Sequence, residues 1–418
     1  MQRHLFSFLA ASTVLVLLHV ATARDLRNVV EPKTPQTCTS LKASGEDDTK
    51  AIQKALDPCT KGKAVALSSG VFHSGPLTIP SGVSLLVEEG VTLRALTDPT
   101  LYDTGAKTCG TIDEYGVGCK AFITMHGAKG SGIYGKGTID GRGSSIMTGK
   151  NITWWHLASN AAAVHKFQNN PRLIQINNSV DITVHQITLI NSPMYHLVAS
   201  ETHGFTVWGI TILTRPSALN SDGIDPIGSQ NVTIAHCNIS TGDDNIAIKA
   251  LTAPAKHISV LNNHFNRGDG MAIGSETNYG VSDVTVSGLT INGTHVGVYV
   301  KSNTMRGGLV ANISFENVCI SNARQPISLD MDYYHHHGNR TPEFRNITLS
   351  NIRVLTNGTF IIHGMNKSNT IEVAFNDVHV TKGAYWSVRN AKIKGSWVED
   401  ETGHSCGYAG NENLLPYS

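Results

Sequence analysis

The 418-residue sequence predicts an all-β fold, a single right-handed parallel β-helix over residues 24–418. From residue 180 onward, pairs of short alternating apolar segments recur at intervals of 23 to 34 residues. Segments this short cannot form stable sheets alone, so a repeat of this length indicates a solenoid in which neighbouring copies stack. The repeats contain no long helical pattern, which favours a β-solenoid, and the chirality of parallel crossovers makes it right-handed.

Residues 1–23 have the pattern of a signal peptide. Arg3 and His4 precede the apolar run Leu15-Val16-Leu17-Leu18, and Ala21-Thr22-Ala23 is a small-residue cleavage site. The apolar run is too short to span a membrane, and no later segment is long and apolar enough to do so. We therefore expect a secreted, extracellular protein with no membrane partner.

The first elements after this leader are a short helix and several strands. Asp47 and Asp48 precede an amphipathic segment at residues 51–56, so we interpret them as helix-capping residues. Residues 64–94 alternate between apolar and polar side chains and are expected to form short strands between Gly and Pro turns. The glycine-rich residues 130–143 lack the phosphate-loop pattern and are interpreted as tight turns within a β array.

Each later repeat is predicted to contain two strands separated by a turn. The first strands of the repeats begin at Ile182, Phe205, Val232, Ile258, Val284, Ile313, Ile347 and Ile371.

Export permits disulfide bonds, and the chain has seven cysteines. Cys109 and Cys119 are close in sequence and flank a Gly-rich turn, so we expect them to pair. Cys38 with Cys59 is a second expected pair. The odd number leaves at least one free thiol, and the apolar strand pattern around Cys237 favours that residue.

Many Asn-x-Ser/Thr sequons indicate a glycoprotein and a eukaryotic secretory route, although β-rich chains also carry sequons by chance. They lie at Asn151, Asn177, Asn231, Asn238, Asn292, Asn312, Asn339, Asn346, Asn357 and Asn366.

The formal net charge is only +1 at pH 7. A binder of nucleic acid or of membrane surfaces would carry a basic excess, so we expect neither partner. A polyanionic substrate would have to be recognised locally, by a few Lys and Arg side chains in a cleft. We expect a monomer without a cofactor.

The segments NSDGIDP, TGDDNIAIK and RGDGMAIGS bring together Asp222, Asp243, Asp244 and Asp269. Carboxylates held close together repel one another and raise each other's pKa. A fold gains nothing from that crowding, so such a cluster is a candidate for acid–base chemistry.

The repeat predicts that these carboxylates share one face of the solenoid. Asp243 and Asp269 each lie 11 residues after the start of their repeat, so we expect them one coil apart. Asp222 precedes Asp243 by 21 residues, also about one coil. Lys301 follows one coil after Asp269, which would give the cleft a polarity.

Other interpretations of these residues stay open at this stage. The aspartates could cap turns, as Asp often does in solenoids, or bind calcium, although no Gly-Asp nonapeptide repeat is present. Asp225, between Ile224 and Pro226, is assigned to a turn. The run at residues 335–337, three histidines, is interpreted as an exposed polar loop, since adjacent residues cannot all face one metal ion.

Paired aspartates without a Ser-His, Cys-His or metal set point to glycoside hydrolysis. In that reaction one carboxylic acid protonates the leaving oxygen while a carboxylate activates water. An extended cleft along a solenoid suits a polymer substrate.

At these motifs the sequence resembles the polygalacturonases of glycoside hydrolase family 28, especially the bacterial type. Asn220-Ser221-Asp222 is similar to the family's Asn-Thr-Asp motif, and Gly242-Asp243-Asp244 matches its Gly-Asp-Asp motif. The segments PRLIQ, LINSP, STGDDNIAIKA and MAIGSE also match, and the likeness extends from Gly45 to about Lys394.

The resemblance implies roles for these residues. Asp243 would be the general acid, Asp222 and Asp244 would activate water, and Lys301 would bind a uronate carboxylate, with inversion at the anomeric carbon. The expected stacking distance is shorter than the usual separation of carboxylates in inverting enzymes. Asn220 belongs to the same group of expected substrate-binding residues.

Two positions depart from the family pattern. Asp269 stands where the family has His in Gly-His-Gly, and Tyr299 stands where it has Arg in Arg-Ile-Lys. Asp269 adds negative charge and should raise the pKa of Asp243, while the loss of Arg removes a bidentate carboxylate clamp. Arg267 is expected to compensate by pairing with Asp269.

The sequence therefore predicts a secreted polygalacturonase that hydrolyses α-1,4-galacturonosyl linkages of pectin. Two alternatives remain: a pectin-binding or inhibitory protein that has lost catalysis, and a hydrolase of a related, less charged polysaccharide with Tyr299 stacking on a sugar ring.

Overall fold

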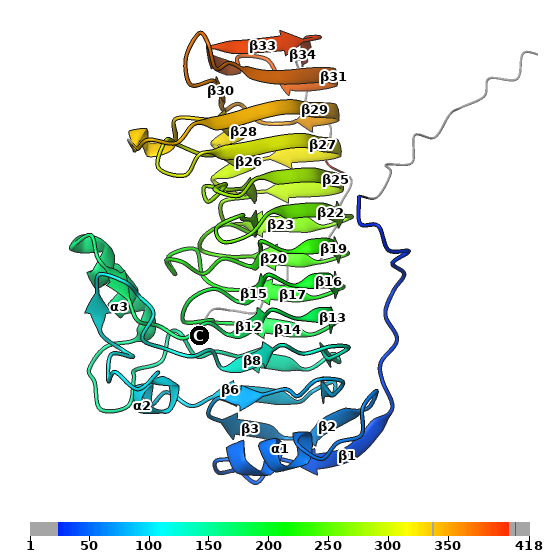
Figure 1. Ribbon diagram of the computed structural model, residues 1–418, viewed down its shortest axis with the longest axis vertical. Helices are drawn as coiled ribbons and strands as arrows, with labels where there is room; N and C mark the ends of the chain where they lie inside the picture. The colour runs from blue at the N-terminus through cyan, green and yellow to red at the C-terminus, as the bar shows by residue number, and fades with distance from the viewer. Residues whose placement is uncertain (1–23, 337, 401–405, 407–418) are drawn as a thin grey trace, which may run out of the picture.

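The computed structural model describes residues 24–336, 338–400 and 406. Short parallel strands stack into a tall, narrow column whose coils climb from the N-terminal to the C-terminal part of the chain (Figure 1). The predicted all-β, right-handed parallel β-helix is thus confirmed. The predicted signal peptide lies outside the described residues. None of the helices in the described part of the chain is long and apolar enough to cross a membrane.

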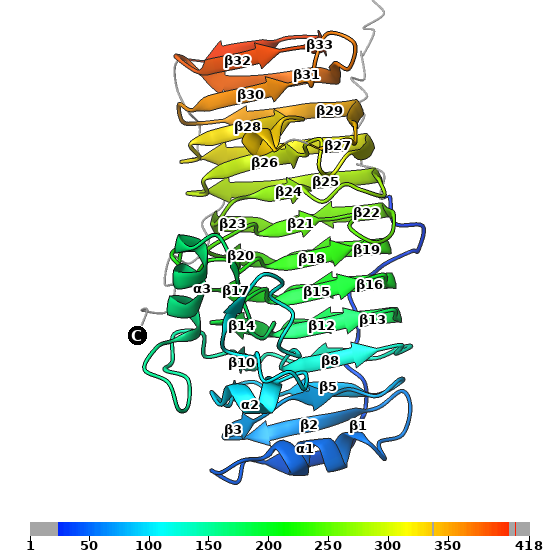
Figure 2. The same cartoon turned by 60° about the vertical axis from the view of Figure 1, so that its left-hand side comes forward.

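One face of the column is an eleven-stranded parallel sheet within the described residues, and it carries the candidate site (Figure 2). Its strands are β4 (Leu77–Thr78), β8 (Ile123–His126), β12 (Ile174–Asn177), β15 (Leu197–Ser200), β18 (Ile224–Ile227), β21 (Ile246–Ile248), β24 (Met271–Ile273), β26 (Val296–Lys301), β28 (Gln325–Asp330), β30 (Thr359–His363) and β32 (Tyr385–Arg389).

The remaining faces form one connected sheet, because β22 and β23 both pair with the long strand β25. Its strands are β1 (Thr37–Lys42), β2 (Ala64–Ser69), β3 (Val71–Ser74), β5 (Ser84–Val87), β6 (Thr92–Ala95), β9 (Gly132–Tyr134), β10 (Thr138–Asp140), β13 (Val180–His185), β14 (Thr188–Ile190), β16 (His203–Trp208), β17 (Thr211–Leu213), β19 (Gln230–Ala235), β20 (Asn238–Ser240), β22 (Ala255–Leu261), β23 (His264–Arg267), β25 (Val281–Asn292), β27 (Gly308–Ser321), β29 (Pro342–Val354), β31 (Ile371–Thr381), β33 (Ala391–Lys394) and β34 (Trp397–Asp400).

The few helices and one small antiparallel sheet lie outside this column. They are α1 (Thr49–Leu56), α2 (Pro99–Tyr102), α3 (Trp154–Ala163), the 3-10 turn η1 (Tyr333–His335), and the pair β7 (Ile112–Asp113) and β11 (Phe167–Gln168). The segment that contains α2 and α3 projects from the column beside β8 and β12 (Figure 2).

The two-strand repeat predicted from the sequence is incomplete, because a typical coil has three strands. In one such coil β13, β14 and β15 follow each other, and each pairs with the equivalent strand of the next coil. The missed third strand belongs to the eleven-stranded sheet. It is only three or four residues long in the middle coils, too short to show a clear alternation.

Inward-facing Ile, Val, Leu and Phe side chains fill the column along its whole length. Along β21, for example, Ile246 and Ile248 are buried in the core while the intervening Ala247 faces out of the coil. Burial of apolar area contributes about 25 cal/mol per Å², so every coil adds a similar increment of stability.

The predicted helix at residues 51–56 is found as α1, with Asp48 at its N-cap position. The Asp48 side chain does not cap the helix and instead accepts a hydrogen bond from Ser44 N. Asp47 accepts from Thr49 N at 2.9 Å. The glycine-rich residues 130–143 form β9, β10 and their turns, as predicted.

Both predicted disulfides, Cys38–Cys59 and Cys109–Cys119, are present, and the buried Cys237 is a free thiol as expected. A third bond, Cys319–Cys406, was not predicted. Its partners are 87 residues apart in the sequence, a separation that gave no local signal for the pairing.

Candidate active site

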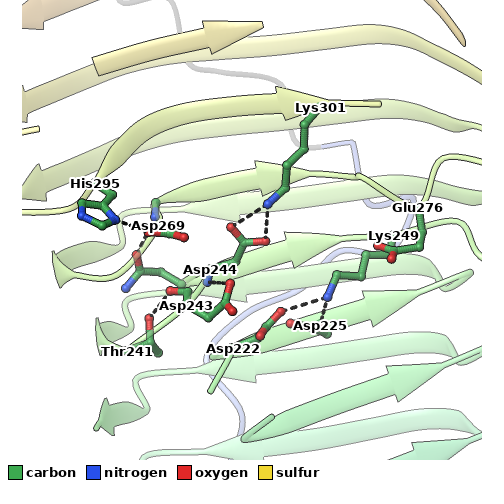
Figure 3. Close-up of polar contacts among 12 residues, drawn as sticks. Asp222, Asp225, Thr241, Asp243, Asp244, Lys249, Asp269, Glu276, His295 and Lys301 are labelled. Atoms are coloured by element: carbon green, nitrogen blue, oxygen red, sulfur yellow. Dashed lines mark hydrogen bonds and ion pairs between the residues drawn. The ribbon is translucent and has the colours of Figure 1, made fainter. Parts of the chain in front are cut away.

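The predicted column of carboxylates is found at the start of consecutive strands of the eleven-stranded sheet (Figure 3). Asp222 precedes β18, Asp244 precedes β21 and Asp269 precedes β24. The parallel register of these strands places the three aspartates at equivalent positions of successive coils. One detail of the prediction is wrong: Asp222 and Asp269 both align with Asp244 rather than with Asp243. The strand register pairs Ile224 with Ile246 and Ile246 with Met271, which fixes this alignment.

Asp243 is held beside this column by hydrogen bonds around its turn. Its Oδ1 accepts from Asp244 N at 2.8 Å, and its carbonyl oxygen accepts from Thr241 Oγ1 at 2.7 Å and Asp269 N at 2.9 Å. One carboxylate oxygen each of Asp222, Asp243 and Asp244 lies within 4.8 Å of the other two. Three acids therefore share one small volume.

Two buried lysines neutralise the outer members of this cluster. Lys249 Nζ lies 2.9 Å from Asp222 Oδ2 and 2.6 Å from Asp225 Oδ2. Lys301 Nζ lies 3.1 and 2.9 Å from the two carboxylate oxygens of Asp244. Asp222 and Asp244 thus each have an ammonium partner.

Asp225 does not have the turn role predicted for it. It lies in β18, is fully buried and faces out of the coil toward Lys249. Pro226 suggested a turn, but here it occupies an inward-facing strand position, where its carbonyl accepts from Lys249 N at 3.1 Å. The Asp225–Lys249 pair was missed, and their separation of about one repeat was the only signal in the sequence.

The pKa values of Asp243 and Asp244 are both raised, but by different balances of burial and neighbouring charges. Burial raises the pKa of Asp243 well above its ordinary value, the carboxylates of Asp222 and Asp244 raise it further, and Lys301 opposes them. Burial also raises the pKa of Asp244, to about 6, but its partner Lys301 limits the rise. Burial opposes the charge on Lys249, yet Asp222 and Asp225 outweigh it and raise its pKa.

Asp269 occupies the next coil, and its charge contributes to the raised pKa of Asp243. The carboxylate of Asp269 is partly exposed and pairs with His295 Nδ1 at 3.2 Å. The partner expected from the sequence was Arg267, which ends β23 and accepts a hydrogen bond from Asn245 Nδ2 at 2.5 Å through its carbonyl oxygen. The structure thus supplies a histidine beside Asp269, contributed by the following coil.

Aromatic rings cover the lysine end of the cluster. Lys301 Nζ lies 4.3 Å from the ring centre of Tyr299 and 5.4 Å from that of Tyr333. The two tyrosine rings meet edge to face at 6.0 Å, and Tyr334 continues the group at 4.1 Å from Tyr333. Lys301 is only 6% exposed, so it is enclosed by Asp244 and these rings.

The remaining predicted residue, Asn220, lies at the rim, where its Oδ1 accepts from Gln168 Nε2 of β11 at 2.9 Å. One buried residue was not predicted. His196 contacts the carbonyl oxygen of Asp222 at 3.0 Å through Nδ1 and Thr214 Oγ1 at 2.6 Å through Nε2. Burial lowers the pKa of His196 to about 4, so at neutral pH it is an uncharged support for the backbone of Asp222.

The carboxylate spacing alone would also allow Asp222, Asp243 and Asp244 to ligate a cation. However, Lys249 and Lys301 already place two ammonium groups against this cluster, and a metal ion would have to compete with them. The arrangement therefore favours acid–base chemistry over calcium binding. In the predicted histidine loop, His335 is exposed and pairs with Asp332 at 2.7 Å, while the third histidine of the run lies outside the described residues.

Comparisons with known proteins agree with this geometry. The model of glycosyl hydrolases family 28 matches residues 59–406. An endo-polygalacturonase of Pectobacterium parmentieri is 46% identical over 379 residues, which are 90% of this chain and 94% of that protein. A polygalacturonase of Ralstonia solanacearum is 38% identical over 355 residues, which are 75% and 67% of the two chains.

Among solved structures, polygalacturonase from Erwinia carotovora ssp. carotovora superposes with a TM-score of 0.86 at 46% identity and covers 89% of this chain and 100% of that chain. An exopolygalacturonase from Thermotoga maritima has the same fold, with a TM-score of 0.75 at 19% identity over 90% and 94% of the two chains. The match along most of the sequence, together with the carboxylate cluster, shows that this chain belongs to glycosyl hydrolases family 28.

Proposed function

We propose that this protein is a polygalacturonase that hydrolyses the α-1,4 linkages of polygalacturonate by acid–base catalysis. The observation that carries the proposal is the unequal pairing within the cluster of three aspartates. Asp222 and Asp244 each bind a buried ammonium, while no ammonium among the described residues is hydrogen-bonded to Asp243. The similarity to an endo-polygalacturonase of Pectobacterium parmentieri and to a polygalacturonase of Erwinia carotovora supports the same substrate.

Asp243 is the proposed general acid. Its raised pKa keeps a proton on the carboxyl group at mildly acidic pH, where it can protonate the leaving glycosidic oxygen. Its partly exposed position leaves that proton accessible to a polymer in the groove.

Asp222 and Asp244 are the proposed bases that activate water. Lys301 lowers the pKa of Asp244 against the effect of burial, and Lys249 forms an ion pair with Asp222, so each proposed base has a cationic partner. Since an ammonium has three N–H donors and Asp244 takes two from Lys301, one donor is left for a uronate carboxylate. Lys301, with Asn220, Arg267 and Tyr299, is therefore proposed to bind substrate.

The test is incubation of the purified protein with polygalacturonate, followed by measurement of new reducing ends and of product length. The family resemblance implies inversion, so proton NMR at early times should show β-anomeric reducing ends. The short carboxylate spacing makes this informative, because inverting enzymes usually separate the two groups by about 6.5–9.5 Å. An initial α-anomer would contradict the assigned roles, and no new reducing ends would remove the proposal.

A bell-shaped pH profile is expected, in which Asp269 sets part of the alkaline limb. Activity should rise as Asp244 ionises, at about pH 6, and fall as Asp243 loses its proton. Asp269→Asn removes a charge that raises the pKa of Asp243, so the alkaline limb should move to lower pH by a few tenths to about one unit. Asp283→Asn, on β25 in the other sheet, is the matched control. An unmoved limb would mean that Asp269 does not act on the general acid.

A second candidate substrate is a less charged pectic polymer, favoured by the rings of Tyr299 and Tyr333 over the enclosed Lys301. Aromatic faces suit the apolar face of a sugar, and Tyr lacks the bidentate clamp that Arg offers to a carboxylate. Comparing kcat/KM on polygalacturonate and on methyl-esterified pectin decides between the two.

We expect Asp269→His with Tyr299→Arg to raise kcat/KM on polygalacturonate about tenfold or more. One change removes a negative charge and the other adds a cation for the uronate, and the gains should be non-additive because the sites are neighbours. Lower activity of the double variant on both polymers would argue against this explanation. Binding to pectin without any hydrolysis, before or after the changes, would instead support a pectin-binding protein.

We also propose that the protein is secreted as a monomer after removal of residues 1–23. Amino-terminal sequencing of the protein from the culture medium should find Arg24 first. Light scattering should give a mass near that of one glycosylated chain.

A further inference from the structure

A second hollow lies on the same eleven-stranded face, away from the carboxylate cluster. It has a volume of about 290 Å³ and is lined by strands β8 and β12 and by the loop that follows β7. Its polar lining includes Lys120, Thr124, Arg172, Gln175 and Asn177. Figure 2 shows β8, β12, β15, β18 and β21 stacked in that order, so the hollow lies on the N-terminal side of the site.

The strand register connects this hollow to the carboxylates. Arg172 precedes β12 by the same number of residues as Tyr195 precedes β15 and Asp222 precedes β18. Arg172 is therefore two coils from Asp222, or about 10 Å at a strand spacing of about 4.8 Å. A polysaccharide lying along this face would reach both places at once.

The charge of the hollow has one sign. Arg172 and Lys120 contribute two cations, and none of the lining residues in the described part of the chain carries a carboxylate. The acidic side chains of the adjoining loop have other partners: Asp113 accepts from Gly116 N at 2.7 Å and Asn169 Nδ2 at 2.8 Å, and Glu114 pairs with Lys166 at 2.8 Å. In a chain of net charge +1, two unopposed cations in one concave site indicate an anionic ligand.

Arg172 is held in place before any ligand arrives. Its guanidinium donates to Gln175 Oε1 at 2.5 Å and lies 5.3 Å from the ring centre of Tyr195. Gln175 in turn donates to Asn177 Oδ1 at 2.6 Å. A fixed guanidinium loses little conformational entropy on binding and can still offer its other N–H groups to a carboxylate as a fork.

The walls also suit a sugar ring. The Cys109–Cys119 bond anchors the loop that forms one wall, and Val117 of that loop is 73% exposed at the rim. Thr124 and Asn177 supply hydroxyl and amide groups that can bind sugar hydroxyls.

We propose that this hollow is a distal subsite that binds one acidic sugar residue, with its carboxylate on Arg172 and Lys120. The proposal deepens the proposed function, since it names a second point at which the same groove recognises a polyuronate. It makes recognition depend on chain length, because only an oligomer long enough to extend from Asp243 to Arg172 uses both places.

The test measures binding by calorimetry in an Asp243→Asn background, so that it does not depend on hydrolysis. Octagalacturonate should bind about 10 to 100 times more weakly when Arg172→Gln is added, the loss expected for a charge-assisted pair. Digalacturonate cannot use both places at once and can still bind beside Asp243, so Arg172→Gln should weaken its binding much less than that of octagalacturonate. Arg172→Lys should recover only part of the affinity, because the charge remains and the fork is lost.

Two controls keep the result interpretable. Arg345→Gln changes an arginine of the other sheet that lines a separate hollow with Lys392 and Lys394, and it should leave octagalacturonate binding unchanged. Lys120→Gln tests the same subsite if Arg172→Gln does not fold. Full octagalacturonate affinity in folded Arg172→Gln and Lys120→Gln variants would overturn the proposal. Because binding is measured without turnover, failure of the hydrolase proposal would leave this result standing.

Discussion

Replacing Asp243 by Asn should reduce kcat on polygalacturonate by about 10²- to 10⁴-fold, the usual contribution of a general acid. The amide has nearly the same shape but has no proton to give to the leaving oxygen. Its Oδ1 can still accept from Asp244 N, and the carbonyl contacts to Thr241 and Asp269 belong to the backbone. The melting temperature should therefore stay close to that of the parent protein.

A substrate with an activated leaving group separates this role from a general disturbance of the site. An aryl galacturonide releases a phenolate that needs little protonation, so Asp243→Asn should slow its hydrolysis much less than that of the polymer. Asp244→Asn should slow both substrates, because water activation is needed in each case. Polymer hydrolysis within tenfold of the parent rate in a folded Asp243→Asn variant would exclude Asp243 as the acid.

The solenoid could be predicted from the sequence because its signal is repeated. Ile, Val and Phe recur at the same place in each coil, and each repeat confirms the others. The third strand of each coil could not be found in this way. At Ile246–Ile248 it consists of three residues, and the preceding aspartates obscure any alternation.

The carboxylates of the site were predictable for a related reason. Asp243 and Asp269 have equal offsets within their repeats, and in the structure they are within one residue of alignment: Asp269 aligns with Asp244, and Asp269 N donates to the carbonyl of Asp243 at 2.9 Å. Partners that reach across coils by long side chains were not predictable. Lys301 bonds Asp244 two coils away, and a strand offset does not say how far an ammonium extends.

Asp225 is a second residue whose partner could not be predicted from the sequence. Ile-Asp-Pro is a frequent turn sequence, and the local pattern outweighed the register. Only the pairing of β18 with β21 shows that Lys249, the residue after β21, lies beside Asp225, where Nζ donates to Asp225 Oδ2 at 2.6 Å. Local sequence patterns therefore fail at positions such as Asp225, where a buried ion pair with a residue of the next coil determines the conformation.

The buried Lys249 leads to the largest expected effect on stability. Lys249→Met should lower the free energy of unfolding by about 3–5 kcal/mol, because it leaves Asp222 and Asp225 as uncompensated buried charges. The exposed Lys392, which pairs with Glu372 at 3.2 Å, is the matched control, and Lys392→Met should cost less than about 1 kcal/mol. Chemical denaturation and calorimetry measure both changes.

The pH dependence of this loss identifies its cause. Burial raises the pKa of Asp225 in the folded protein above its ordinary value of 3.8, and removing the ammonium that opposes this effect should raise it further. A carboxyl group with a raised folded-state pKa destabilises the protein progressively as pH rises above its unfolded-state pKa. The Lys249→Met protein should therefore lose stability from about pH 4 upward, relative to the parent. Adding Asp225→Leu should restore part of the stability and weaken this pH dependence, because an apolar side chain replaces the unpaired charge. A loss no larger than that of Lys392→Met, or one that does not change with pH, would show that the lysine is not the charge that keeps these two carboxylates buried.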